Sequence, residues 1–140
     1  MTGVQTCALP ILLGDSLEKI AFEKAGIIKE NIPVVIGEVI RETKNVFEEV
    51  AQEKNATLFY AQEKRYVTDW NYEHHHLQIA VADKHNDERK NYTLDLPGIY
   101  QTKNIITALE ALHQLQIQGW NITQHDIEKG LLQKIGRAHV

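Results

Sequence analysis

The chain has 140 residues, of which 43% are hydrophobic, 24% are charged and 7% are aromatic, as in an ordinary single globular domain. No apolar stretch approaches the roughly 20 residues that a membrane-spanning helix needs, which excludes that class of protein. The formal net charge of −4 argues against a protein that binds nucleic acid non-specifically.

The two ends of the chain resemble translated laboratory DNA. Residues 1–11 (MTGVQTCALPI) can be read from one strand of a sequencing adapter, and residues 134–140 (KIGRAHV) from its reverse complement, followed by a stop codon. Two unrelated protein ends would rarely encode both strands of one oligonucleotide, and residues 1–11 lack the basic and apolar regions of a signal peptide. We therefore expect both ends to be non-native and residues 12–133 to be an internal piece of a longer gene.

This interpretation changes the composition. The single cysteine, Cys7, lies in the suspect head, so it no longer indicates a reducing compartment. Without Lys134 and Arg137 the chain carries 13 basic and 19 acidic side chains, which is a net charge of −6.

The first half of the credible region predicts helices that alternate with short strands, as in α/β proteins. The first helix has Asp15 and Glu18 as a possible capping box, and Gly26 either ends the helix or is tolerated inside it. The apolar run PVVIG is typical of a strand buried on both faces of a parallel sheet. The expected helices are residues 12–29 and 42–54, and the expected strands are residues 33–37 and 57–61.

The second half predicts an antiparallel insert followed by two helices. Alternating apolar residues around Ile79 favour a half-buried antiparallel strand, and Pro97-Gly98 predicts a turn. Thr123 and Asp126 form another possible capping box, which opens a helix that runs through Leu132. The expected strands are residues 66–70, 74–82 and 91–96, with a polar connection at 83–90, and the longer helix is residues 101–118.

Lys24 stands out because it lies in the middle of the apolar stripe of the first helix. An ammonium that is buried without a partner costs several kcal/mol, so a lysine there either extends to solvent near the helix end or has a special role. The pattern alone favours the first reading.

Two patches of sequence resemble the folylpolyglutamate synthase and dihydrofolate synthase family of the Mur-ligase-like superfamily. The first holds Leu13-Gly14, Ile20-Ala21 and the run from Glu23 to Ile27, followed by Pro33 and Gly37. The second is the run from Gly98 to Asn104, followed by Ala108-Leu109 and Ala111-Leu112. It departs from the family pattern at Tyr100, where histidine is common, and at Ile105, where alanine is common. The resemblance spans residues 12–133.

The resemblance implies the later part of a P-loop ATPase domain, namely a parallel-sheet remnant with helices and a small antiparallel insert. It implies a cytoplasmic, monomeric parent enzyme of folate biosynthesis and one-carbon metabolism, which uses ATP and Mg²⁺. Such an enzyme phosphorylates the carboxylate of dihydropteroate or a folate, and the amino group of glutamate then attacks the acyl phosphate. Neither a nucleic acid nor a membrane is expected as a partner.

The resemblance also implies roles for particular side chains. The family carries a carbamylated lysine at the position of Lys24, and a carbamate is an oxygen ligand suited to a hard metal. Desolvation on an apolar face would favour the neutral amine that adds CO₂. Asn104 corresponds to an asparagine that contacts the nucleobase, and Gln101 is expected to face the same cleft. Glu23 is more simply a solvated surface residue than a partner of the metal site.

Three other features are discounted. The run from His74 to His76 lacks the number of ligands of a metal site, because only two of three neighbouring strand residues share a face. Trp70 and Trp120 favour packing roles. Gly136-Arg137 imitates an ATP-contacting pair of the family but falls in the suspect tail.

Several parts of such an enzyme are missing from the sequence. It contains no Gly-Lys-Ser/Thr phosphate-binding loop, so we expect this chain to be inactive alone, with exposed apolar faces on PVVIG. The sequence cannot separate dihydrofolate synthase from folylpolyglutamate synthase activity. Two alternatives stay open, namely another Mur-type amino-acid ligase and a non-catalytic α/β interaction module, which should expose no apolar patch.

Overall fold

A computed structural model describes residues 10–96 and 98–133, with side chains from Ser16 onward. The chain divides into two compact units, Met1–Phe59 and Tyr60–Val140, and each is described by itself. The expected non-native ends lie outside the described residues, except that Pro10 and Ile11 begin the first helix. No helix in the described part of the chain is both long and apolar enough to cross a membrane.

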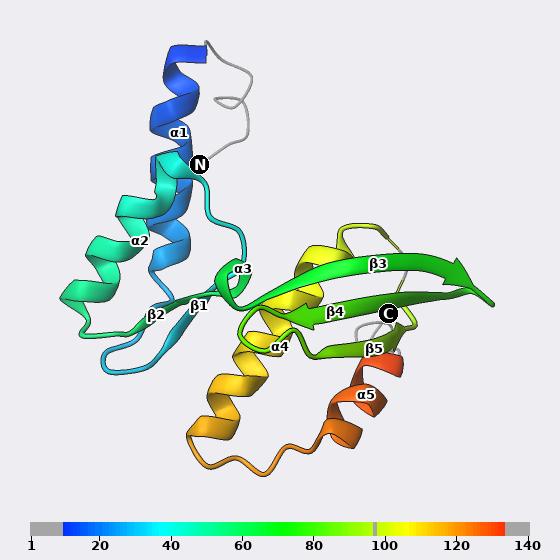
Figure 1. Cartoon of the computed structure of the whole chain (residues 1–140). Coiled ribbons are helices and arrows are strands. Elements are labelled where there is room, and N and C mark those ends of the chain that lie inside the picture. The colour runs from blue at the N-terminus through cyan, green and yellow to red at the C-terminus, as the bar shows by residue number, and fades with distance from the viewer. Residues whose placement is uncertain (1–9, 97, 134–140) are drawn as a thin grey trace. The chain divides into compact units, whose positions relative to one another are not determined.

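The first unit has the expected order of helix, strand, helix and strand (Figure 1). Helix α1 packs against α2, and β1 pairs with β2 in a parallel two-stranded sheet, the arrangement that a crossover helix permits. The elements are α1 Pro10–Ala25, β1 Val34–Ile36, α2 Arg41–Glu53 and β2 Leu58–Tyr60. The α/β prediction and the order of these elements are therefore confirmed.

Helix α1 differs from the predicted helix of residues 12–29 at both ends. It begins at Pro10, a residue suited to the first helical position because it has no N–H to satisfy. The expected cap at Asp15 is wrong, because Asp15 lies inside the helix. After Ala25 the backbone forms turns, in which the amide of Gly26 donates to the carbonyl oxygen of Glu23 at 3.1 Å. Gly26 therefore follows the end of the helix.

The core of the first unit is small. Among the side chains described from Ser16 onward, Ala25, Ile28 and Ala51 form its buried cluster, which joins the end of α1 to α2. The strand β1 is half-buried along its length, so the expectation of a strand enclosed on both faces is wrong for this chain. Large apolar side chains remain exposed, including Ile27 with 78% of its surface accessible.

The second unit is a three-stranded antiparallel sheet with helices. Strand β4 is central, α4 packs against β3, and α5 packs against β5 (Figure 1). A short helix, α3, replaces the end of the strand predicted at residues 57–61. The elements are α3 Ala61–Lys64, β3 Arg65–Glu73, β4 His76–Asp83, β5 Arg89–Leu94, α4 Gln101–Ile117 and α5 Gln124–Leu132.

The hairpin between β3 and β4 corrects one prediction. Strand β4 begins at His76 rather than His74, because His74 and His75 form the two-residue turn with φ of 53° and 65°. Positive φ at both central residues suits the right-handed twist of the flanking strands. The three histidines therefore do not share a strand, and the premise that His74 and His76 lie on one strand face is wrong.

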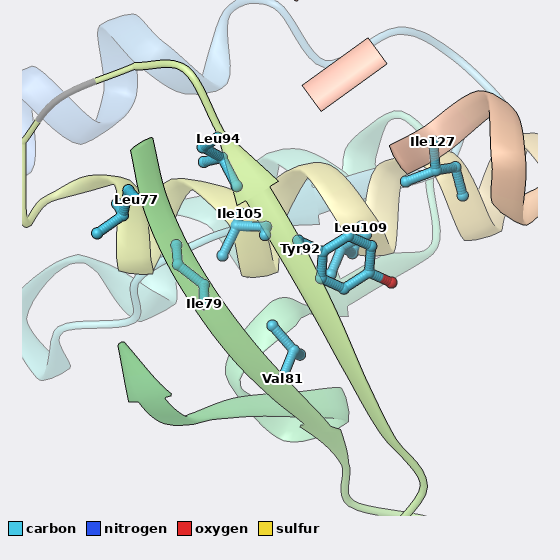
Figure 2. Packing of buried hydrophobic residues seen from close by; sticks show 8 residues of the cluster. All are labelled: Leu77, Ile79, Val81, Tyr92, Leu94, Ile105, Leu109 and Ile127. Atoms are coloured by element: carbon cyan, nitrogen blue, oxygen red, sulfur yellow. The ribbon is translucent and has the colours of Figure 1, made fainter. Parts of the chain in front are cut away.

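The core of the second unit brings together β4, β5, α4 and α5 (Figure 2). Alternate residues of β4 point into it, as the alternating sequence predicts. The capping box of α5 is confirmed, since Thr123 and Asp126 exchange side-chain to backbone hydrogen bonds. The buried cluster contains Leu77, Ile79, Val81, Tyr92, Leu94, Ile105, Leu109 and Ile127.

Candidate functional site

The predicted nucleobase-contacting residues lie in the first turn of α4. The helix begins at Gln101, as the sequence predicts. The side-chain amide of Asn104 donates to Oε1 of Gln101 at 3.1 Å, so the two residues lie together on the helix surface. Asn104 is exposed and Gln101 is half-buried. The pair keeps donors and acceptors free, which a purine edge can use.

The turn before α4 is held by residues from elsewhere. Gly98 has a φ of 111°, and a Cβ atom at this position would collide with the ring of Tyr100. The amide of Gly98 donates to Oη of Tyr72 on β3 at 2.6 Å. Sequence reasoning missed Tyr72, because no local pattern connects it with a residue 26 positions later.

Lys24 lies on the other unit, at a hollow of about 420 Å³ between α1, β1 and α2. The buried residues of this helix face are Ala21, Ala25 and Ile28, whereas Lys24 is exposed. The exposure of Lys24 agrees with the interpretation that the pattern alone favours, a lysine that extends to solvent near the helix end. The desolvated surroundings that the family resemblance implies are not supplied by the described residues. The hollow is lined mainly by apolar side chains, with Lys24, Glu38 and Thr43 as its polar members.

The neighbouring residues give Lys24 little support as a metal centre. Glu23 is exposed, as expected of a solvated residue. Among residues 10–96 and 98–133, no group of three or more His, Cys, Asp or Glu could hold a metal ion.

In the histidine run, His76 has Nε2 3.5 Å from Oδ1 of Asp95, and its Nδ1 lies 2.9 Å from the carbonyl oxygen of His74.

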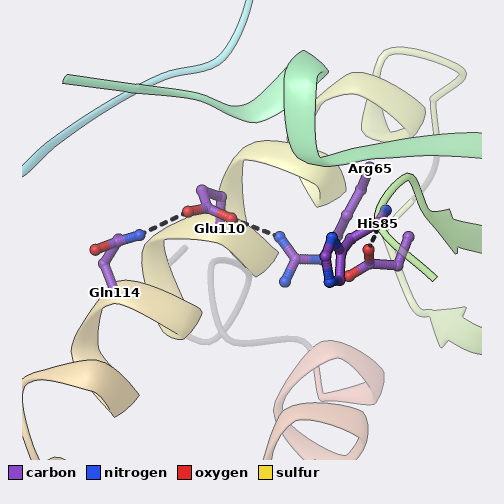
Figure 3. Close-up of polar contacts among 5 residues, drawn as sticks. Arg65, His85, Glu110 and Gln114 are labelled. Atoms are coloured by element: carbon purple, nitrogen blue, oxygen red, sulfur yellow. Dashed lines mark hydrogen bonds and ion pairs between the residues drawn. The ribbon is translucent and has the colours of Figure 1, made fainter. Parts of the chain in front are cut away.

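A buried ionic network links β3 to α4 (Figure 3). Nη1 of Arg65 donates to Oε1 of Glu110 at 2.7 Å, and the amide of Gln114 donates to Oε2 of Glu110 at 2.7 Å. Glu110 is completely buried, so both carboxylate oxygens need such partners. The sequence contains no signal for this network apart from the i, i+4 spacing of Glu110 and Gln114. Its role is to join helix and sheet.

Comparison with known proteins extends these observations. No family model matches the chain. It is 33% identical over 123 residues to the dihydrofolate synthase/folylpolyglutamate synthase of Escherichia coli, a match that covers 88% of this chain and 26% of that protein. The chain therefore spans about a quarter of the length of this curated relative.

Solved structures of folylpolyglutamate synthases are also similar to this chain. A folylpolyglutamate synthase from Thermotoga maritima is 30% identical, with a TM-score of 0.70 over 88% of this chain and 28% of the other. A folylpolyglutamate synthase solved with AMPPCP and folate is 25% identical, with a TM-score of 0.70 over 83% of this chain and 28% of the other. A muramoyl-peptide ligase from Acinetobacter baumannii, at 16% identity and a TM-score of 0.60 over 85% of this chain and 25% of the other, shares the fold alone.

By sequence and by structure, most of this chain is therefore similar to a part of dihydrofolate and folylpolyglutamate synthases, and it shares a Mur-ligase-like fold.

Proposed function

We propose that residues 12–133 are part of the central ATP-binding domain of an ATP-dependent ligase that adds L-glutamate to dihydropteroate, to a folate, or to both. The observation that carries this proposal is the match to dihydrofolate and folylpolyglutamate synthases along 88% of the chain. The two sequence patches, around Lys24 and around Asn104, lie within that matched length. They hold the residues to which we assign roles in the reaction.

The proposed reaction forms an amide bond through an acyl phosphate. ATP transfers its γ-phosphoryl group to the carboxylate of the pterin substrate and ADP leaves. The amino group of glutamate then attacks the acyl carbon, the amide forms with loss of a proton from nitrogen, and phosphate leaves. The solved relative with AMPPCP and folate supports this class of substrates.

The residues at the start of α4 fit the base of the nucleotide. Asn104 and Gln101 hold their side-chain amides side by side on an exposed surface, where one amide can donate to and accept from adenine. No Gly-Lys-Ser/Thr loop is present in the sequence to hold the phosphates. The chain thus offers a place for the base but no cradle for the triphosphate.

The fit to Mg²⁺ is poor in this chain. The exposed amine of Lys24 can reach CO₂, and as a carbamate it would offer oxygen atoms, but the described residues supply no set of further ligands. In our proposal the remaining ligands belong to segments of the parent that this chain does not include.

The open hollow beside Lys24 favours a piece of an enzyme over a self-contained interaction module. A module should bury its apolar faces, yet Ile27 is 78% exposed and β1 is only half-buried. We propose that further sheet of the parent covers Ile27 and Lys24 together, which would supply the desolvated surroundings that carbamylation needs.

The test is glutamate ligation by the full-length parent with Lys24→Gln, and with Lys19→Gln as the control on the exposed side of the same helix. We expect Lys24→Gln to abolish ATP-dependent ligation and Lys19→Gln to retain it. Near-normal turnover with Lys24→Gln would refute the role of Lys24. Hydrolysis of ATP by the purified 140-residue chain would count against the proposal that the chain is inactive alone.

A further inference from the structure

We propose that Tyr72 is a positioning residue, whose hydroxyl fixes the turn that sets Gln101 and Asn104 against the nucleotide base. The inference rests on the proposed function of that pair. The first observation is the 2.6 Å hydrogen bond from the amide of Gly98 to Oη of Tyr72. It joins strand β3 to the residue from which the turn into α4 begins.

Gly98 transmits this restraint to the helix. Its carbonyl oxygen accepts the amide of Gln101, the first residue of α4, at 3.1 Å. Gly98 is thus bound through its N–H to Tyr72 and through its C=O to the helix start. A shift of Gly98 would displace the same turn of helix that carries Asn104.

The conformation of Gly98 restricts which residue this turn accepts. Gly98 adopts a φ of 111°, which L-residues rarely adopt, and a Cβ atom placed there would meet the ring of Tyr100. The hydroxyl of Thr102 donates to the carbonyl oxygen of Ile99 at 2.7 Å, which closes the first turn. Two tyrosines therefore contact Gly98. The ring of Tyr100 lies against it, and the hydroxyl of Tyr72 accepts its N–H.

A second contact holds the same end of the sheet. Tyr72 is paired with Leu77, and Leu77 with Leu94, so the residue after Leu94 lies at the end of the sheet that carries Tyr72. That residue is Asp95, and its Oδ1 lies 3.5 Å from Nε2 of His76. The segment between β5 and α4 is therefore attached to the β3–β4 hairpin at two points.

In this proposal Tyr72 acts through its hydroxyl and not through burial of its ring. The residue is 51% exposed, so its ring contributes limited apolar burial. Trp70 contacts the ring edge to face, with centroids 6.1 Å apart, and this contact does not involve the oxygen. Removing the oxygen alone should therefore leave the fold intact and release the turn.

The test compares Tyr72→Phe with Tyr66→Phe, a control on the same strand with 38% exposure. In the 140-residue chain we expect the amide of Gly98 to exchange about five- to tenfold faster in Tyr72→Phe, with unchanged exchange in β4. In the full-length parent we expect the KM for ATP to rise about three- to tenfold, with kcat within about twofold and the KM for glutamate unchanged. Tyr66→Phe should alter none of these values.

Unchanged exchange at Gly98 would overturn the proposed tie between Tyr72 and the turn. Faster exchange with an unchanged KM for ATP would overturn the positioning role and leave a hydrogen bond of local importance. A wild-type parent that adds no glutamate in the presence of ATP would overturn the proposed function, and the positioning role with it. That outcome is distinguishable, because it concerns the unmutated enzyme.

Discussion

The two units of this chain both combine helices with a sheet but differ in the size of their buried cores. In the second unit, eight buried residues from two strands and two helices form one core. In the first unit, three residues form the buried cluster, and Phe22 and Ile27 are 66% and 78% exposed. Both units have amphipathic helices, so amphipathicity alone does not make a core. A core needs elements that face one another across an apolar surface, and the described residues build the larger core in the second unit.

The comparison predicts that the same kind of truncation will have very different effects in the two units. Leu77→Ala should lower the free energy of unfolding of the second unit by about 3 kcal/mol, because Leu77 is completely buried. Ile27→Ala should change the first unit by less than about 0.5 kcal/mol. Both tryptophans, Trp70 and Trp120, lie in the second unit, so their fluorescence during denaturation reports that unit, and hydrogen exchange in α1 reports the first. Equal effects would mean that the first unit is covered in solution.

Breaking the ionic network should have a second, smaller effect on stability, and this effect is confined to the second unit, which contains the network. Arg65→Met leaves the buried carboxylate of Glu110 without its cation and should destabilise the second unit by about 2 kcal/mol. Lys90→Met, at an exposed position of the same sheet, is the control and should be nearly neutral. Adding Glu110→Leu to Arg65→Met should recover stability, because it removes the uncompensated charge. Failure of this recovery in denaturation experiments would show that the pair is not coupled.

The smallest expected effect on stability concerns the capping box of α5, because its groups are exposed to solvent. The backbone N–H of Thr123, followed by its hydroxyl, holds the pKa of Asp126 below its ordinary value of 3.8. Because the pKa is lowered on folding, the contribution of the carboxylate is present above pH 3.8 and is lost as the pH falls through the lower folded value. The protection of α5 amides, measured as exchange relative to the intrinsic rate at each pH, should therefore fall in this acidic range.

The acidic effect has a matched control. Asp126→Asn should remove this pH dependence of the protection of α5, whereas Asp87→Asn, at an exposed loop position outside the helix, should leave it intact. Carboxyl chemical shifts of Asp126 that titrate at an ordinary value would contradict the capping interaction.

Much of the local structure could be predicted from the sequence. The helix that begins at Gln101, the cap at Thr123 and the alternation along β4 follow from apolar spacing and side-chain chemistry within a few residues. The errors fall where the backbone departs from local preference. The positive φ of His74 and His75 makes a turn where alternation predicts strand, and the helix continues past Asp15 toward Pro10.

The candidate site was predictable only in part. Asn104 and Gln101 could be paired in advance, because three positions in a helix bring side chains together. Tyr72 could not, because its contact with Gly98 depends on the strand pairing that places β3 beside the turn. The pattern alone favoured a solvent-exposed Lys24 and the family resemblance implied a desolvated one, because burial depends on what packs against the helix and not on the helix itself.

By itself, the sequence determined the alternation of elements, the cap of α5 and the motifs that resemble the ligase family, because these depend on neighbours along the chain. The tertiary structure alone decided that Glu110 binds Arg65, that Gly98 is attached to Tyr72, and that Lys24 stands open at a hollow. Those contacts depend on sheet register and on packing between elements. Hydrophobic burial sets this packing, and it is a property of facing surfaces rather than of any single segment.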